Sequence, residues 1–235
     1  MKNRMIKYLT VTIGVIVSGC SNGQTTTAIN GIQNTTKGIT QEQSDLIFNN
    51  TKTFPNNTQL SIALIKNGEV DFVGVKRTDD TIRRIENFRE VFEIGSITKV
   101  FTATLLSDLV NNQTLELDDN IQDYVDFKIK LEEGITFKEL ANHTSGLPRL
   151  PSNLNLMLAH RDNPYKDYDE EKLKEYLTTE VQLGQEPGVK YEYSNLGAGI
   201  LGFELALITN TPYESLLQEK IFRKYKMSNS TSERE

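Results

Sequence analysis

Apolar and polar side chains follow two different patterns along this chain, and the first predicts strands. The runs Gln59 to Lys66 and Glu69 to Arg77 are rich in apolar and β-branched residues and are joined only by Asn67-Gly68. Two residues of this type between two such runs are typical of a tight antiparallel hairpin. We therefore predict a β-hairpin over residues 59–77, followed by a polar connection that contains Asp79, Asp80, Arg83 and Arg84.

Helical patterns flank this hairpin and dominate the rest of the chain. Apolar residues recur at helical spacing from Ile97 to Val110, which predicts a helix there. Two short helices are predicted by capping boxes, Thr40 with Gln43 and Thr136 with Glu139, because each pair satisfies backbone donors at a helix start. Further helices are expected over Asp169 to Glu180, Leu196 to Ile208 and Tyr213 to Tyr225.

The first twenty residues have the three-part layout of an export signal. Lys2, Arg4 and Lys7 precede the mostly apolar stretch Tyr8 to Val17, and small residues then lead to Cys20. A membrane-spanning helix is the alternative, but this stretch falls well short of the ~20 apolar residues that a bilayer core requires. The ending resembles a bacterial lipoprotein signal, which implies removal of residues 1–19 and a lipid on Cys20.

Composition limits the remaining possibilities. Residues 20–38 are mainly Thr, Asn, Gln and Gly and are expected to form a flexible tether, whereas residues 39–235 are long enough for one domain. Cys20 is the only cysteine, so its use as an anchor would leave none for a disulfide, a zinc site or catalysis. The net charge of −6 with mixed signs gives no basic face for nucleic acid.

The stretch "FEIGSITKVF" places Ser96 and Lys99 three residues apart at a predicted helix start. At this spacing both side chains lie on one face, so the lysine amine can approach the serine oxygen and activate it as a nucleophile. A serine that caps the helix beside a solvated lysine is the alternative. A Ser-x-x-Lys pattern is expected about once by chance in a chain of this length, so it cannot decide between the two readings.

A second cluster, "YEYSNLG", adds Tyr193 and Asn195. In an extended segment these residues point to the same side, so both can face one pocket. A cation near a tyrosine favours its phenolate, which can act as a general base, and an asparagine offers both a donor and an acceptor to a substrate amide. A buried tyrosine with a turn-forming asparagine remains possible on these residues alone.

Four blocks in this order resemble the serine β-lactamase and penicillin-binding protein superfamily, in its branch of class C β-lactamases, DD-carboxypeptidases and related esterases. The blocks are "FEIGSITKVFTATLL", "LELDDNIQDYV", "ITFKELANHTSGLPRL" and "EPGVKYEYSNLGAGILG". The resemblance extends from about Leu60 to the end of the chain. It implies an α+β fold of the β-lactamase/transpeptidase type, with an antiparallel sheet flanked by helices and a helical subdomain.

The resemblance also implies site roles. Ser96 is expected to be the acylated nucleophile, Lys99 its helper, Tyr193 the base and Asn195 the group that holds a substrate amide. The reaction would be acyl transfer from a β-lactam, a D-alanyl peptide or an ester, with no cofactor and no metal. The expected location is the outer side of the bacterial cell membrane, through lipid on Cys20, and the oligomeric state is left open.

One family motif is not found. Members carry Lys-Ser/Thr-Gly or His-x-Gly on a strand well after the Tyr-x-Asn segment, and residues 196–235 contain neither. We therefore expect an N-terminal portion of a family member that lacks the C-terminal strands, with an unpaired edge on the hairpin. The alternative to an active hydrolase is accordingly a non-catalytic lipoprotein fragment or a module that binds peptides.

Other candidate sites are weaker. His143 and His160 are the only histidines, and no Gly-x-Ser-x-Gly elbow supports a Ser-His-Asp triad. Asp118-Asp119 and Asp79-Asp80 lack calcium-loop spacing and are better explained as solvated turns.

Overall fold

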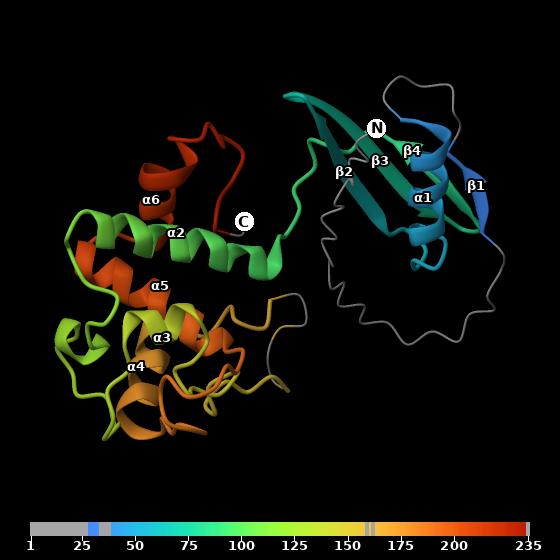
Figure 1. Cartoon of the computed structure of the whole chain (residues 1–235). Helices are drawn as coiled ribbons and strands as arrows, with labels where there is room; N and C mark the ends of the chain where they lie inside the picture. The colour runs from blue at the N-terminus through green and yellow to red at the C-terminus, as the bar shows by residue number, and fades with distance from the viewer. Residues whose placement is uncertain (1–27, 33–38, 158–159, 161–162, 234–235) are drawn as a thin grey trace, which may run out of the picture. The chain divides into compact units, whose positions relative to one another are not determined.

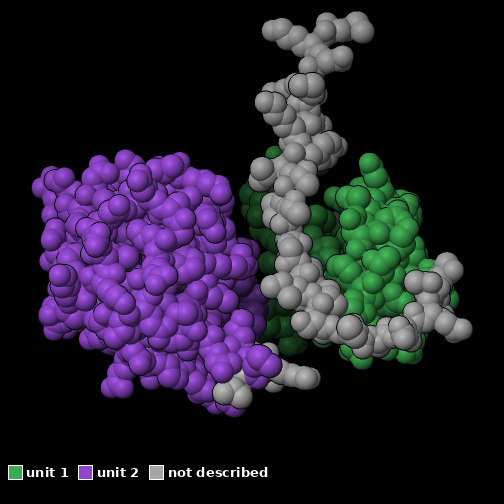
Figure 2. Space-filling model, turned by 90° about the horizontal axis from the view of Figure 1, so that it is seen from below, with its two compact units in different colours: residues 1–92 green, residues 93–235 purple. Residues whose placement is uncertain are grey.

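The computed structural model describes residues 28–32, 39–157, 160 and 163–233. They belong to two compact units, Met1–Phe92 and Glu93–Glu235 (Figure 2). The expected export signal and Cys20 lie outside the described residues. Within those residues, no helix is both long enough and apolar enough to cross a membrane.

A four-stranded sheet is the centre of the first unit (Figure 1). Its strands, in the spatial order β1-β4-β3-β2, are β1 (Ile29–Gly31), β4 (Thr81–Ile85), β3 (Glu69–Thr78) and β2 (Gln59–Lys66). β1 runs parallel to β4, and the other neighbours are antiparallel. The predicted hairpin is confirmed: Lys66 pairs with Glu69, and Asn67 and Gly68 both have the positive φ angles of a two-residue turn.

Two strands lie where the sequence predicts none. The prediction of a polar connection after the hairpin is wrong. Thr81–Ile85 form β4, and Ile82 lies in the core with 1% of its surface exposed. A single buried isoleucine among charged residues is too weak a pattern to predict a strand. β1 (Ile29–Gly31) lies within the segment expected to be a tether, and its pairing with β4 satisfies its backbone.

One face of the sheet is covered and the other is exposed. Helix α1 (Gln41–Thr51) begins with the predicted capping box of Thr40, and its Ile47 belongs to a buried cluster with Val73 and Val75 of β3. Burying each such aliphatic side chain contributes roughly 1.5–3 kcal/mol. On the opposite face the sheet exposes Ile65, Val70 and Phe72. Among the described residues β2 pairs only with β3, which leaves the expected free edge.

The second unit is helical (Figure 1). Its helices are α2 (Thr98–Asn111), α3 (Phe137–Ala141), α4 (Glu170–Thr179), α5 (Asn195–Thr209) and α6 (Tyr213–Leu217). Each lies within one or two residues of a predicted helix, except that α6 stops at Leu217 and a π-helical turn continues to Phe222. The bond from the Arg223 amide to the Gln218 carbonyl, five residues back, closes this turn.

Helix α5 is central to the second unit because it contacts α2, α3 and α6. It is buried on most sides, as an apolar helix in a core should be. Its Ile200 and Leu205 are fully buried in a cluster with Leu105 of α2 and Phe137 of α3. This packing brings the start of α2 and the start of α5 together, and both carry predicted site residues.

Candidate active site

Ser96 lies in a single 3₁₀ turn, Gly95–Ile97, which leads directly into α2. The helix therefore begins at Thr98, one residue later than predicted. Neither the turn nor the helix has a side-chain cap, so the alternative of Ser96 as a helix cap is not supported. The Ser96 side chain is exposed, and its Oγ instead accepts hydrogen bonds from two other predicted site residues.

Lys99 joins the start of α2 to the start of α5. Its Nζ donates to Ser96 Oγ at 3.1 Å and to Asn195 Oδ1 at 2.8 Å. The same nitrogen lies 4.9 Å from the centre of the Tyr193 ring, within range of a cation–π contact. Lys99 therefore contacts all three other residues, which excludes a freely solvated lysine.

Tyr193 and Asn195 lie on either side of the residue that caps α5. Ser194 has an extended backbone and accepts a hydrogen bond from the Gly197 amide, so it is the N-cap of the helix. Tyr193 donates to Ser96 Oγ at 2.7 Å, and Asn195 is the first residue of α5. With an extended backbone at the cap, Tyr193 reaches both Ser96 and Lys99, and Asn195 reaches Lys99.

The environment of Tyr193 shifts its titration. Partial burial favours the neutral phenol and raises the pKa, but interactions with the Lys99 ammonium and the Ser96 hydroxyl, and the positive charge of Arg149, lower it. The net effect holds the pKa of Tyr193 below its ordinary value of 10. A phenol next to two cations is thereby more easily converted to a base.

Two residues that the sequence does not predict as functional, His143 and Arg149, also contact Tyr193. The His143 ring lies 4.5 Å from the Tyr193 ring, centre to centre, and the Arg149 guanidinium carbon lies 5.2 Å from it. Burial first, and then the charge of Lys99, lower the pKa of His143. Both residues belong to the "HTSGLPR" block, which is part of the family resemblance. Nothing in the sequence of this block shows that it lies against Tyr193.

The loop from His143 to Arg149 is fixed to the segment before α5 by backbone hydrogen bonds. The His143 carbonyl accepts from the Glu192 amide at 2.8 Å, and the Arg149 carbonyl accepts from the Asn195 amide at 3.0 Å. Gly146 has a φ of +73°, and a Cβ there would lie 2.2 Å from the Gln185 carbonyl oxygen. Glycine is therefore required for this close approach.

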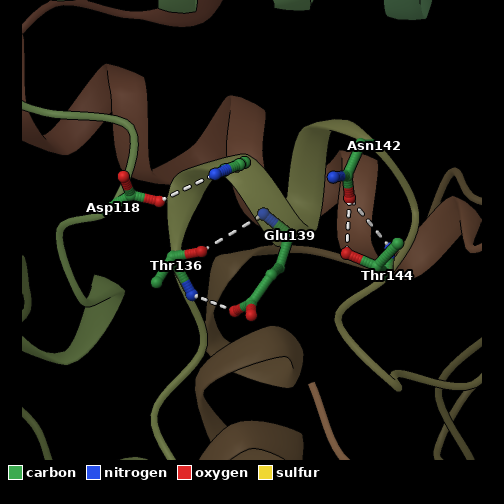
Figure 3. Close-up of polar contacts among 6 residues, drawn as sticks. Asp118, Thr136, Glu139, Asn142 and Thr144 are labelled. Carbon is green, nitrogen blue, oxygen red and sulfur yellow. Dashed lines mark hydrogen bonds and ion pairs between the residues drawn. The ribbon is translucent and has the colours of Figure 1, made fainter. Parts of the chain in front are cut away.

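Helix α3 positions this loop (Figure 3). The predicted capping box is confirmed: Thr136 Oγ1 accepts from the Glu139 amide, and Glu139 accepts from the Thr136 amide. At the other end of the helix, Asn142 Oδ1 accepts from both the amide and the hydroxyl of Thr144. This turn holds His143 at a φ of 62°, which aims its ring towards Tyr193.

Two cavities of the second unit adjoin Asn195. The larger, about 470 Å³, lies between α2, α5 and α6 and includes Lys99 and Tyr213 in its wall. The other, about 290 Å³, is mainly apolar and is lined by Leu150, Pro151, Leu154, Tyr165, Tyr168, Asp169, Glu170, Leu173, Asn195, Leu196, Gly199, Ile200 and Phe203. Asn195 therefore contributes to the wall of both cavities.

The remaining candidates have local structural roles. Asp119 accepts from the Glu116 amide and the Tyr124 hydroxyl. Asp118 pairs with Lys138, and Figure 3 shows the Asp118 side chain in this contact. Asp79 is hydrogen-bonded to Asn56 at a turn. Among the described residues, no group of three or more His, Cys, Asp and Glu side chains could hold a metal ion.

The histidines do not form a catalytic triad with Ser96. His143 Nδ1 accepts from the Ser194 amide at 3.3 Å, so that nitrogen is not held by a carboxylate. His160 instead lies 3.5 Å from Asp167. The described residues therefore favour Lys99 and Tyr193 as the polar partners of Ser96.

Comparison with known proteins shows the family to which the chain belongs. The Beta-lactamase family model matches residues 53–234, and the chain belongs to that family. It is 34% identical over 146 residues to the D-alanyl-D-alanine-carboxypeptidase/endopeptidase AmpH of Escherichia coli K12, covering 60% of this chain and 36% of AmpH. It is 33% identical over 155 residues to Beta-lactamase-like protein 4 of Dictyostelium discoideum, covering 60% of this chain and 26% of that protein.

The fold is also shared with solved structures. A Beta-lactamase/D-alanine carboxypeptidase from Yersinia pestis, solved with citrate, superimposes with a TM-score of 0.68 at 24% identity, over 81% of this chain and 53% of that one. The expected α+β fold of the β-lactamase/transpeptidase type is thus confirmed. The chain spans about a quarter to a third of the length of the two curated relatives above.

Proposed function

We propose that this protein is a serine acyl-hydrolase or acyltransferase that acts through an acyl-enzyme on Ser96. The observation that carries the proposal is that Lys99 and Tyr193 both hydrogen-bond the Ser96 hydroxyl, at 3.1 and 2.7 Å, while Asn195 hydrogen-bonds Lys99 at 2.8 Å. A nucleophile, a cation and a base within hydrogen-bond reach are the parts that covalent acyl transfer requires. Membership of the Beta-lactamase family supports the same class of reaction.

The contacts support a proposed role for each residue. Tyr193, as phenolate, takes the Ser96 proton while Oγ attacks the substrate carbonyl and forms the new C–O bond. The charge of Lys99 stabilises the phenolate and the developing negative charge nearby. Tyr193 then returns the proton to the leaving amine or alcohol as the C–N or C–O bond breaks, and water or another acceptor releases the acyl group from Ser96.

The position of Asn195 supports a proposal about the class of substrate. Its Oδ1 is held by Lys99, which orients the amide group beside the mainly apolar cavity of about 290 Å³. We therefore propose a substrate with an amide or a related carbonyl next to the reacting bond: a β-lactam, a D-alanyl peptide or an ester. The relative AmpH is named for D-alanyl-D-alanine carboxypeptidase activity, which favours the peptide class.

We also propose that the protein is exported and held on the outer face of the bacterial membrane by lipid on Cys20. The support is the order of basic, apolar and small residues before the only cysteine. A substrate in the cell envelope would suit this location.

Labelling with a fluorescent penicillin tests the proposed reaction. The full chain is expected to acquire a covalent label whose mass maps to the Ser96 peptide, and Ser96→Ala should abolish it. Ser107→Ala is a matched control, since Ser107 is an exposed serine on the same helix. Soluble, folded protein that takes no Ser96-dependent label from the penicillin, a D-alanyl peptide or an activated ester would favour a non-catalytic binding module instead.

A further inference from the structure

Arg149 places a second positive charge on the ring of Tyr193. Its guanidinium carbon lies 5.2 Å from the ring centre, and Lys99 Nζ lies 4.9 Å from the same point. Both distances fall within the range at which a cation is attracted to an aromatic face. Lys99 also bonds Ser96, whereas Arg149 faces Tyr193 from the separate loop that begins at His143.

Backbone hydrogen bonds hold Arg149 against the start of α5 and so fix the position of its Cα. Its carbonyl accepts hydrogen bonds from the amides of Asn195 and Leu196, at 3.0 and 3.2 Å, at the start of α5. The preceding carbonyl, of Pro148, accepts from the Ser194 hydroxyl at 2.7 Å. These three bonds join residues 148 and 149 to the segment that carries Tyr193, so the guanidinium and the phenol ring are held by one local framework.

No acidic side chain in the described part of the chain neutralises the charge of Arg149. Among the residues that the structure describes, no Asp or Glu side chain forms an ion pair with it. An exposed arginine usually has little effect on its surroundings, because solvent screens its charge. Here the guanidinium lies against the ring of Tyr193, so the positive charge of Arg149 acts on that phenol at close range.

We propose that Arg149 is a positioning residue for the reaction of Ser96, which orients the Tyr193 ring and stabilises its phenolate form. This inference rests on the proposed function, because the phenolate matters only if Tyr193 is the base. A guanidinium suits the role because it stays charged at all relevant pH values. The lowered pKa of Tyr193, to which the charge of Arg149 contributes, agrees with it.

The test compares Arg149→Gln, which removes the charge, with Arg149→Lys, which keeps it. Both variants retain the backbone carbonyl that holds α5, so a loss through folding is separated from a loss through charge. Arg223→Gln is the matched control, because it removes the same charge from an exposed arginine that bonds the Gln218 carbonyl instead.

Two measurements are made on each full-length protein. The first is the pH titration of Tyr193 by ¹³C NMR, assigned with Tyr193→Phe. In Arg149→Gln the titration should move to higher pH, while Arg149→Lys and Arg223→Gln stay near wild type. The second is the rate of Ser96 labelling by fluorescent penicillin at pH 7, which Arg149→Gln should lower by about threefold to tenfold.

The outcomes separate this inference from the proposed function. If wild type labels at Ser96 but Arg149→Gln leaves both the Tyr193 titration and the labelling rate unchanged, the role of Arg149 is wrong. If Tyr193 titrates differently in Arg149→Gln although neither wild type nor any variant takes a Ser96-dependent label from penicillin, a D-alanyl peptide or an activated ester, the contact stands and the proposed function fails. Loss of labelling in Arg149→Lys equal to that in Arg149→Gln would also overturn the charge argument.

Discussion

The phenol oxygen of Tyr193 lies 2.7 Å from the hydroxyl oxygen of Ser96, although 97 positions separate the two residues in the chain. This is the distance of a strong hydrogen bond between oxygens, and it puts the phenol that we propose as the base, once it has lost its proton, next to the proposed nucleophile. The contact depends on the packing of α2 against α5 within one unit.

Tyr193→Phe should lower the rate of Ser96 acylation by about 10²- to 10⁴-fold, the usual contribution of a positioned general base. The ring and its contacts with His143 and Lys99 are kept, so stability should change little. The rate is measured as covalent labelling by fluorescent penicillin. Tyr191→Phe is the control, because Tyr191 also packs on His143 but has an exposed side chain. An equal loss in both variants would contradict a specific role for Tyr193.

The acylation rate should rise with pH as Tyr193 loses its proton. Its pKa is lowered in the folded protein, since Lys99, Ser96 and Arg149 together outweigh the opposing effect of burial. The rising limb of the pH–rate profile is therefore expected below pH 10, and Tyr193→Phe should remove it. Labelling rates between pH 6 and pH 10 give the profile. A limb that persists unchanged in Tyr193→Phe would assign the titration to another group.

Lys99→Met should also lower acylation, by about 10²-fold or more, because it removes the cation that favours the phenolate. It leaves Asn195 Oδ1 without its donor at 2.8 Å, so substrate affinity should weaken as well. Rates measured over a range of penicillin concentrations separate the two effects. Lys138→Met is a suitable control, since Lys138 is exposed and pairs with Asp118 outside the site. A Lys99→Met protein that labels at the wild-type rate would exclude the proposed helper role.

His143 should make the protein less stable as the pH falls. Burial and the charge of Lys99 lower the pKa of His143 in the folded state, so the unfolded chain binds the proton first. Stability is therefore full above the unfolded value of about 6.5 and decreases below it, towards the folded pKa. Protonation would also remove the acceptor at Nδ1 for the Ser194 amide.

Urea unfolding at pH 7.5 and pH 5.5, compared between wild type and His143→Gln, measures this effect. The pH-dependent loss should be smaller in the variant. His160→Gln is the control, because that side chain is exposed and lies near Asp167. The same slope in wild type and His143→Gln would show that the destabilisation comes from other groups.

Glu204 of α5 should destabilise the protein as the pH rises. Its side chain is fully buried, its carboxyl oxygens have no hydrogen-bond partner among the described residues, and burial raises its pKa to about 8. The folded state therefore keeps a proton that the unfolded chain loses, so stability declines from about pH 4.5 to pH 8. Glu204→Met should raise the free energy of unfolding at pH 7.5 by about 2–4 kcal/mol.

The measurement for Glu204 is urea unfolding at pH 5 and pH 7.5. The gain in Glu204→Met should be larger at pH 7.5 than at pH 5. Glu175→Met, at an exposed position of α4, is the control and should change stability by no more than about 0.5 kcal/mol. A gain that does not depend on pH would point to better packing instead of relief from a buried carboxyl.

Cys20→Ala should release the protein from the membrane fraction if residue 20 carries lipid. In bacteria that express the full chain, labelling with an alkyne fatty acid should mark the wild type and leave Cys20→Ala unlabelled. Replacing Ser21 by Ala is the control, because it changes the neighbouring residue and keeps the thiol. Fatty-acid labelling of the Cys20→Ala protein would reject this anchor.

Local rules predict much of this protein. The hairpin follows from Asn67-Gly68 between two apolar runs, and the start of α3 from the capping box of Thr136 and Glu139. Both elements depend on residues within a few positions of each other, because capping hydrogen bonds and the turn residues determine the local backbone conformation. Strand β4 could not be predicted in this way, because Ile82 is buried by its neighbours in the sheet and not by residues close to it in the sequence.

The sequence by itself named Ser96, Lys99, Tyr193 and Asn195, through motif spacing and the resemblance of four blocks to a known family. It did not show that His143 and Arg149 lie on the Tyr193 ring, since neither has a local pattern that marks contact. Tertiary structure decided this, because backbone bonds such as that from Glu192 to His143 join segments nearly fifty residues apart. Contacts of that kind depend on how the whole unit packs, and no short stretch of sequence encodes them.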